Sequence, residues 1–286
     1  MALAINTNMS ALNAQRQLTK STNALGKTFE RLSSGLRINR AGDDAAGLSI
    51  TTRMTAQIRG QNQAIRNTND AISVTQVAEG ALNETTNALQ RIRELAVQAA
   101  NDTNSSADRN NIQQEINQMV YEIQRIATQT QFNNQKVLNG SYITKKFQVG
   151  ENGGQTITMS ILGASVMKLG VNSTSIKLYS APGGVAYAAN KLQSLANRLI
   201  GKIDSALDSV SDIRASLGAY QNRFEAVIAN LSNVVENTNA ARSRILDADI
   251  AMETANLTKN SILQQAGTAV LAQANQQPAM ALKLLQ

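Results

Sequence analysis

The 286-residue sequence contains no cysteine, no histidine and no tryptophan, and only two prolines. Without cysteine, the chain has no disulfide, no thiolate nucleophile and no cysteine metal site. Without histidine it lacks the commonest metal ligand and the usual general base, which excludes a Ser-His-Asp triad and an HExxH zinc site. Catalysis by lysine or carboxylates stays open, so an enzyme is disfavoured rather than excluded. We expect no catalytic residues, no cofactor and no metal.

Aromatic residues make up only 3% of the chain, although hydrophobic residues make up 42%. Such a composition is typical of long helices packed side by side rather than of a thick aromatic core. No apolar run approaches the roughly 20 residues that span a bilayer. The opening MALAINTNMSALNAQ lacks the charged and continuous apolar regions of a secretory signal peptide. Any export is therefore expected to use another route.

The net charge of +7 is concentrated near the N-terminus, because residues 1–66 hold nine basic and three acidic side chains, a net of +6. A basic segment can bind nucleic acid or an anionic membrane. These charges stand singly, however, and no base-stacking aromatic residues lie between them. We favour a solvated or partner-facing helical surface, and we expect neither nucleic-acid binding nor membrane insertion.

Apolar residues at helical spacing predict a mainly α-helical chain. The longest run extends from Leu192 to Val235, enough for a helix of roughly 65 Å. Spacing of three and four sustained over that length favours a long, antiparallel, coiled-coil-like rod. Pro278 is expected to disturb the last turn of a C-terminal helix. Apolar positions in the first half are Ile5, Met9, Leu12, Leu18, Leu25, Phe29 and Leu32, then Ile58, Ile65, Ile72, Leu82, Leu89, Ile92 and Ala96, then Ile112, Ile116, Met119, Ile123 and Ile126.

Between the helical halves the pattern changes to alternation around the turn ENGG, which predicts a small β-hairpin. The alternating residues are Phe147 and Val149 before the turn and Ile157, Met159 and Ile161 after it. Asn139-Gly140 predicts a tight reversal before this hairpin. Residues 166–178 are ambiguous, and Pro182–Gly184 predicts a hinge before the long helix.

The stretch RLSSGLRINRAGDDAAGLSI, residues 31–50, suggests three kinds of site. Its glycines have the spacing of neither a P-loop nor a dinucleotide-binding loop. Asp43 and Asp44 are consecutive, so on a helix they diverge by about 100° and make a poor catalytic pair. We interpret the stretch as a helix corner. Gly42 would take a conformation closed to other residues, and Asp43 or Asp44 would cap the next helix.

The same stretch resembles the signature of bacterial flagellins, the subunits of the flagellar filament. Further similar segments are MALAINTNMSALNAQ, LQRIRELAVQAAN, TQFNNQKVLNG, FQVGENGGQTI and the tail ARSRILDADIAMETANLTKNSILQQAGTAVLAQANQQPAMALKLLQ. The resemblance covers residues 1–160 and 186–286, and Asn134 stands where many members have glycine. Longer flagellins insert outer domains in the middle, so the chain resembles a short form that lacks them.

The resemblance implies a division into four parts. Residues 1–40 and 245–286 would form an inner helical domain that is disordered in the monomer and folds into an inner coiled coil on assembly. Residues 41–55 would form a connecting spoke. Residues 56–140 and 186–244 would form the helical rod, and residues 141–185 a short β-hairpin and variable insert.

The resemblance also implies a function and partners. The chain would be exported unfolded by a flagellar type III apparatus and polymerise with itself into a hollow helical filament for motility. That filament would lie outside the cell, or in the periplasm where flagella are internal. Partners would be an export chaperone at the C-terminal segment, the filament cap and the hook–filament junction proteins. The residues expected to build the inner core are Leu18, Leu25, Phe29, Leu32, Leu257, Leu263, Val270 and Leu271.

Flagellins sensed by a vertebrate Toll-like receptor present an arginine, a leucine and a glutamate on the rod. Here Arg91, Leu95 and Glu115 match them, with Gln98 beside Leu95. The alternative role of these residues is ordinary rod surface that contacts a neighbouring subunit. Two alternatives for the whole chain are a hook–filament junction protein of the same family and a basic, amphipathic, membrane-active protein.

Overall fold

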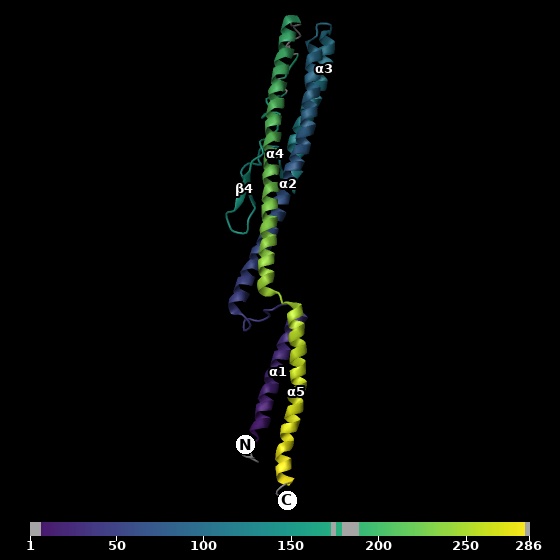
Figure 1. The fold of residues 1–286 in the computed structure, drawn as a ribbon. Coiled ribbons are helices and arrows are strands. Elements are labelled where there is room, and N and C mark those ends of the chain that lie inside the picture. The colour runs from purple at the N-terminus through teal and green to yellow at the C-terminus, as the bar shows by residue number, and fades with distance from the viewer. Residues whose placement is uncertain (1–6, 173–175, 179–188, 284–286) are drawn as a thin grey trace. The chain divides into compact units, whose positions relative to one another are not determined.

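The computed structural model describes residues 7–172, 176–178 and 189–283, and it is mainly α-helical (Figure 1). The predicted hinge at Pro182–Gly184 lies outside these residues. The helices are α1 (Met9–Ser34), α2 (Ala45–Ala100), α3 (Ser106–Gln129), α4 (Ala189–Leu246) and α5 (Ile250–Lys283). The strands are β1 (Gln131–Phe132), β2 (Gln135–Lys136), β3 (Lys145–Gln148) and β4 (Thr156–Met159). The predicted class of long antiparallel helices with a small β-hairpin is confirmed.

The chain divides into two compact units. The first, called the terminal unit below, comprises residues 1–58 and 236–286. The second, called the central unit, comprises residues 59–235. Because α2 and α4 are long, each contributes residues to both units.

In the terminal unit, α1 and α5 lie side by side and run antiparallel (Figure 1). Gly35 ends α1 in the left-handed conformation, with φ 70°, and its N–H donates to the Arg31 carbonyl. The chain after Gly35 pairs with the segment between α4 and α5 through one antiparallel bridge, Leu36 with Asp247. Asp249 then caps α5 by accepting a hydrogen bond from the Met252 N–H at 3.1 Å.

The expected effect of Pro278 is wrong, because α5 continues past it to Lys283. Proline removes one backbone hydrogen bond and crowds the preceding turn. The helix tolerates the loss of this hydrogen bond, because the residues after the proline are also helical.

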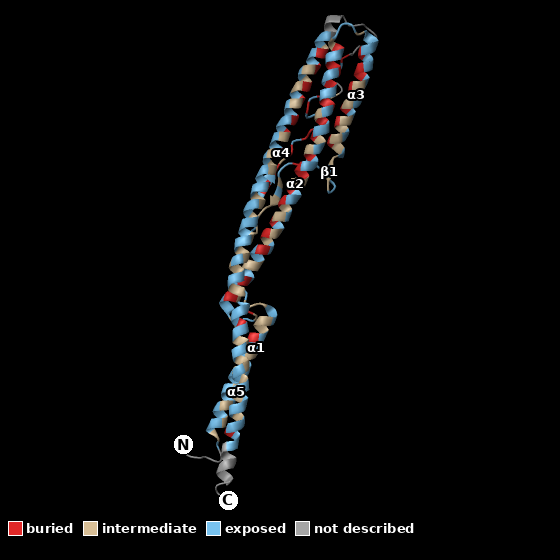
Figure 2. Ribbon diagram, turned by 45° about the vertical axis from the view of Figure 1, so that its right-hand side comes forward, coloured by how far each residue is buried: buried red, intermediate tan, exposed pale blue. Residues whose placement is uncertain are grey.

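In the central unit, α2 and α4 run antiparallel, and α3 returns along α2 (Figures 1 and 2). The α3 N-terminus is fixed by a capping box, in which the Ser105 hydroxyl accepts from the Asp108 N–H and the Asp108 carboxylate accepts from the Ser105 N–H. Buried residues of the three helices, together with those of the middle segment, form one continuous core. Figure 2 shows the buried positions as stripes along facing sides of these helices.

The predicted stripe of α2 is buried at Ile58, Leu82, Leu89, Ile92 and Ala96, but the structure differs from the prediction between Ile58 and Leu82. Ile65 and Ile72 are only half-buried. The buried positions of this part of the helix are mostly small or polar, and Val74 is the largest apolar side chain among them: Gln61, Ala64, Thr68, Ala71, Val74, Thr75 and Ala78. Each threonine in this set satisfies its hydroxyl by donating to a carbonyl one turn earlier. Short side chains in this stripe permit close packing, which is why the large isoleucines lie to its side.

The predicted hairpin is confirmed as β3 and β4, which pair antiparallel with Phe147 opposite Ile157. Phe147 packs edge-on against Phe224 of α4, with 6.0 Å between ring centroids. The tight two-residue reversal lies at Asn133-Asn134, where φ is 46° and 61°, rather than at Asn139-Gly140. The described residues of segment 166–178 form neither helix nor strand, and five of their apolar side chains enter the core: Val166, Leu169, Val171, Ile176 and Leu178.

Candidate assembly interface

The eight apolar residues expected to build an inner core lie on two different faces of the α1–α5 pair. Five are half-buried in the terminal unit: Leu18, Leu25, Leu32, Leu257 and Leu271. We call these the inward residues. The two helices approach closely beside Leu18, because a Cβ atom at Gly267 would lie 3.3 Å from the Leu18 Cδ1 atom.

The other three residues are exposed to solvent. Phe29 is 64% exposed, Leu263 46% and Val270 58%. Large apolar residues that the sequence did not single out for this role are also exposed on the pair: Met9, Leu12, Ile250, Met252 and Ile262. We call these eight the outward residues. Helix α5 carries apolar side chains all round, a pattern typical of a helix that becomes buried on every side.

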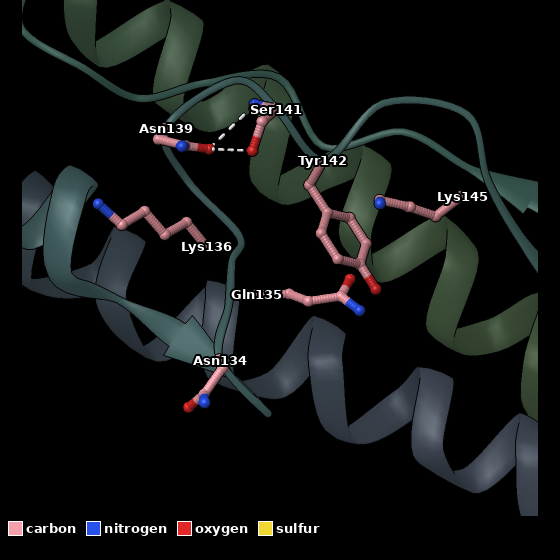
Figure 3. Close-up of a pocket in the computed structure, with 7 residues that line it drawn as sticks. All are labelled: Asn134, Gln135, Lys136, Asn139, Ser141, Tyr142 and Lys145. Atoms are coloured by element: carbon pink, nitrogen blue, oxygen red, sulfur yellow. Dashed lines mark hydrogen bonds between the residues drawn. The ribbon is translucent and has the colours of Figure 1, made fainter.

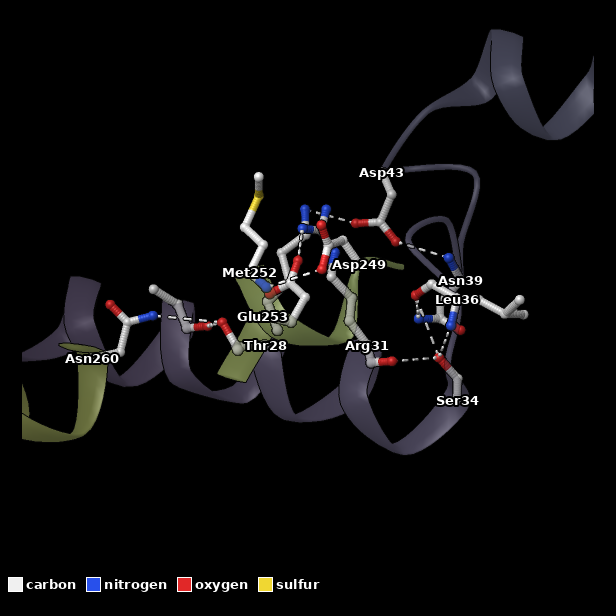
Figure 4. Close-up of polar contacts among 12 residues, drawn as sticks. Thr28, Arg31, Ser34, Leu36, Asn39, Asp43, Asp249, Met252, Glu253 and Asn260 are labelled. Atoms are coloured by element: carbon white, nitrogen blue, oxygen red, sulfur yellow. Dashed lines mark hydrogen bonds and ion pairs between the residues drawn. The ribbon is translucent and has the colours of Figure 1, made fainter. Parts of the chain in front are cut away.

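Polar contacts fix the register of α1 against α5. Asn8 Nδ2 donates to the Ala274 carbonyl at 2.7 Å, near one end of the pair. Near the other end, Arg31 Nη1 donates to Glu253 Oε1 at 2.9 Å (Figure 4). The Glu253 side chain is only 9% exposed, and Arg31 Nε is buried with no hydrogen-bond partner among the described residues. A buried pair of this kind resists sliding, because a shifted register leaves charged groups unpaired.

The predicted corner is built by the two aspartates in different ways. Asp44 caps α2, since its Oδ1 accepts from the Gly47 N–H at 2.8 Å. Asp43 Oδ2 accepts from the Asn39 and Arg40 N–H groups, and its Oδ1 pairs with Lys27 Nζ at 2.7 Å. The hydrogen bond from Lys27, followed by those two N–H groups, lowers the pKa of Asp43 to about 2.

The left-handed glycine of this stretch is Gly35 and not Gly42, which has no positive φ. The expected conformational role of Gly42 is therefore wrong. The left-handed residue of the reversal is Gly35, which is the C-cap of α1 and precedes Gly42 in the chain.

The four residues matched to receptor recognition do not share one exposed surface. Arg91 and Gln98 are exposed, and Arg91 binds Glu115 of α3 through Nη2 at 2.9 Å and Glu94 through Nη1 at 3.0 Å. Leu95 is only 2% exposed and belongs to the core of the central unit. Leu95 follows Arg91 by four residues, so the two lie on the same side of α2. That side borders the core, and it therefore holds both an exposed charged residue and a buried apolar one.

Within the described part of the chain, no helix has an apolar stretch that could span a bilayer. The same residues contain no group of three or more carboxylates placed to hold a metal ion.

Two family models match separate parts of the chain. The bacterial flagellin N-terminal helical region matches residues 5–143, and the bacterial flagellin C-terminal helical region matches residues 200–285. The chain belongs to the bacterial flagellin family. Members of this family are structural filament proteins rather than enzymes, and the chain has the structural role of a filament subunit.

Two relatives are similar to the chain over all or nearly all of its length. A flagellin of Halalkalibacterium halodurans is 47% identical over 281 residues, covering 98% of this chain and 99% of the relative. A flagellin of Xenorhabdus nematophila is 48% identical over 317 aligned positions and covers both chains completely. The solved structure of a Bacillus cereus flagellin is 29% identical, with a TM-score of 0.46 over 58% of this chain and 88% of that chain.

Proposed function

We propose that the chain is exported unfolded and polymerises into the hollow flagellar filament through the outward residues of α1 and α5. The single observation that carries this proposal is the separation of apolar residues into two faces. The inward residues hold the two helices together, whereas the outward residues remain in water unless another copy covers them. A contact between two different surfaces of identical copies extends into a helical polymer when its rotation does not close.

We also propose that residues 1–40 and 245–286 become ordered only on assembly. Few large apolar side chains of the terminal unit are fully buried, Ile38 and Ile58 among them. Ordering a residue costs about 1–2 kcal/mol of backbone entropy, so burial by neighbouring copies has to offset that loss. On this basis residues 41–55 act as the spoke, residues 56–140 and 186–244 as the rod, and residues 141–185 as the insert.

The decisive test is seeded polymerisation of purified chain carrying Val270→Asp, with Val270→Ile as the matched control. Covering a valine contributes about 1.5–3 kcal/mol, and an unpaired carboxylate in that place opposes assembly further. Val270→Ile should form hollow filaments by electron microscopy, with a gain of helix by circular dichroism. Val270→Asp should stay soluble with the helix content of the wild-type monomer. Normal filaments from Val270→Asp would overturn the proposal.

Leu25→Asp tests the other face, because Leu25 is an inward residue. This change should prevent both the pairing of α1 with α5 and polymerisation, while the central unit stays folded. Hydrogen exchange of the monomer checks the last point, because amides of the central unit should keep the protection that they have in the wild-type monomer. Loss of that protection would mean that the variant had unfolded as a whole.

The remaining partners are proposed from the family. We place an export chaperone on the apolar residues of α5, and we expect the cap and the hook–filament junction proteins to contact the growing and basal ends. A Toll-like receptor contact would use Arg91, Gln98 and Glu115. Leu95 would contribute only by packing in the core of the central unit, without touching the receptor. The proposed location is the filament outside the cell, or the periplasm in an organism with internal flagella.

A further inference from the structure

A pocket of about 320 Å³, lined by both polar and apolar surface, opens in the central unit, beside the β1–β2 hairpin (Figure 3). None of its residues belongs to α1 or α5, so nothing in the proposed assembly mechanism uses it. Six residues of its wall matter here: Gln135, Lys136, Asn139, Ser141, Tyr142 and Lys145. They come from β2, from the turn that follows it and from the start of β3.

The wall of this pocket offers hydrogen-bond donors and two positive charges, and no carboxylate lines it. Lys136 has no ion pair within the described part of the chain. Asn139 Oδ1 is occupied, since it accepts from the Ser141 N–H at 3.0 Å and from the Ser141 hydroxyl at 2.6 Å. The Asn139 amide therefore has its NH₂ group left to donate to a ligand.

Tyr142 supplies the floor of the pocket. Its side chain is buried, and its ring lies between Lys145 and Gln135 with the hydroxyl directed toward Gln135 (Figure 3). Lys145 Nζ lies 5.5 Å from the ring centroid, so a cation–π contact holds this ammonium group over the ring. Burial raises the pKa of Tyr142, so the hydroxyl keeps its proton and remains a donor at neutral pH.

We propose that this pocket binds a small oxyanion of monosaccharide size, a sugar that carries a carboxylate or a phosphate ester. Lys145, which is held over the Tyr142 ring, binds the anionic group, whereas Lys136 extends to the opposite side (Figure 3) and adds long-range attraction. Asn139, Gln135 and Tyr142 bind the sugar hydroxyls. A surface where solvated lysines merely happen to be neighbours would lack this set of amide and hydroxyl groups between the charges. The volume lies at the lower end of the range for small-molecule sites, about 300–1,000 Å³, which limits the ligand to roughly one ring.

Glucuronate, glucose 6-phosphate and neutral glucose are each titrated into the full-length monomer, and binding is measured by calorimetry and saturation-transfer NMR. Saturable binding of either anion, without binding of glucose, supports the proposal. The anion that binds more tightly shows whether the site prefers a carboxylate or a phosphate ester. Absence of saturable binding by both anions overturns it. Equal binding of glucose overturns the role of the two lysines.

Variants then locate the site. Lys145→Gln should weaken binding about tenfold, the effect of losing one charge-assisted hydrogen bond, and Lys136→Gln should weaken it less. Lys146→Gln is the matched control, because Lys146 adjoins Lys145 in β3 but does not line the pocket. Its affinity should equal that of the wild type. Equal weakening in all three variants would indicate non-specific attraction and overturn the proposal, and circular dichroism verifies that each variant is folded.

Discussion

Arg31 and Glu253, which lie 222 positions apart in sequence, meet in an ion pair between α1 and α5, with 2.9 Å from Nη1 to Oε1. It is the one ion pair that joins these two helices within the described residues. The N-terminal and C-terminal helices are therefore held in register by a contact that neither can make alone.

Removing the glutamate should destabilise the pair more than removing both partners. Glu253→Ala leaves the Arg31 guanidinium without its acceptor, and we expect it to lower the free energy of unfolding of the terminal unit by about 2 kcal/mol. The double variant Arg31→Leu, Glu253→Leu should lose less, because no buried charge is left unpaired. Hydrogen exchange of α1 and α5 amides in assembled filaments, where these helices are ordered, measures both. Lys20→Gln, which removes an exposed charge from α1, is the control, and an equal loss in that variant would contradict the prediction.

Gly267 should tolerate no branched side chain. A Cβ atom there would lie 3.3 Å from Leu18 Cδ1, so Gly267→Val should separate α5 from α1 and destabilise the pair by about 1–3 kcal/mol, as overpacking does. Gly26→Val in α1 is the matched control, because a Cβ at Gly26 meets no other atom within 4 Å. Thermal melting of assembled filaments, followed by circular dichroism, should separate the two. If both variants melt alike, the close approach at Gly267 does not limit packing.

Sequence periodicity predicted the long helices because their apolar stripes repeat over many turns, as from Leu192 to Val235 in α4. It predicted the β3–β4 hairpin because alternation around ENGG changes the period from helical to two. Both signals depend only on residues that are close together in sequence, so they can be recognised without knowledge of tertiary contacts. Asp44 was likewise predicted to be one of two candidate caps, because it lies just before the first turn of α2.

The features that sequence reasoning missed depend on partners distant in sequence. The stripe from Gln61 to Ala78 consists mostly of small and polar residues, with Val74 among them, and a search for large apolar residues passes over it. Apolar residues of α1 and α5 were treated as one core because spacing alone does not say which face meets the partner helix. The pairing of Arg31 with Glu253 had no local signal at all.

Enlarging the small stripe of α2 should disturb the central unit. Ala78 is fully buried, so Ala78→Leu forces three extra carbon atoms into a filled core and should destabilise the unit by about 1–3 kcal/mol. Ala226→Leu makes the same change at an exposed position of α4 and should leave stability nearly unchanged. Urea unfolding compares the midpoints of the two variants. Tolerance of Ala78→Leu would mean that the stripe is not close-packed.

The corner should weaken in acid through Asp43. Its pKa is lowered to about 2, so the stabilising contribution of this carboxylate is complete above the unfolded value of 3.8 and disappears as the pH falls through about 2. Solid-state NMR titration of the Asp43 carboxyl in assembled filaments should give a midpoint well below 3.8. Asp43→Asn should abolish the acid dependence of exchange at the Asn39 and Arg40 amides in the filament. A midpoint near 3.8 would show that the Lys27 contact is not made in the filament.

Methionine oxidation should report directly which face is covered during assembly. In the monomer, hydrogen peroxide should oxidise the thioethers of Met9, Met252 and Met167 readily, since they are 68%, 63% and 81% exposed. Met159, which is fully buried, should resist and serves as the internal control. In filaments, Met9 and Met252 should become protected because they belong to the outward residues of the α1–α5 pair. Peptide mass spectrometry gives each rate separately, and an unchanged rate for Met252 in filaments would place the assembly contact elsewhere on the chain.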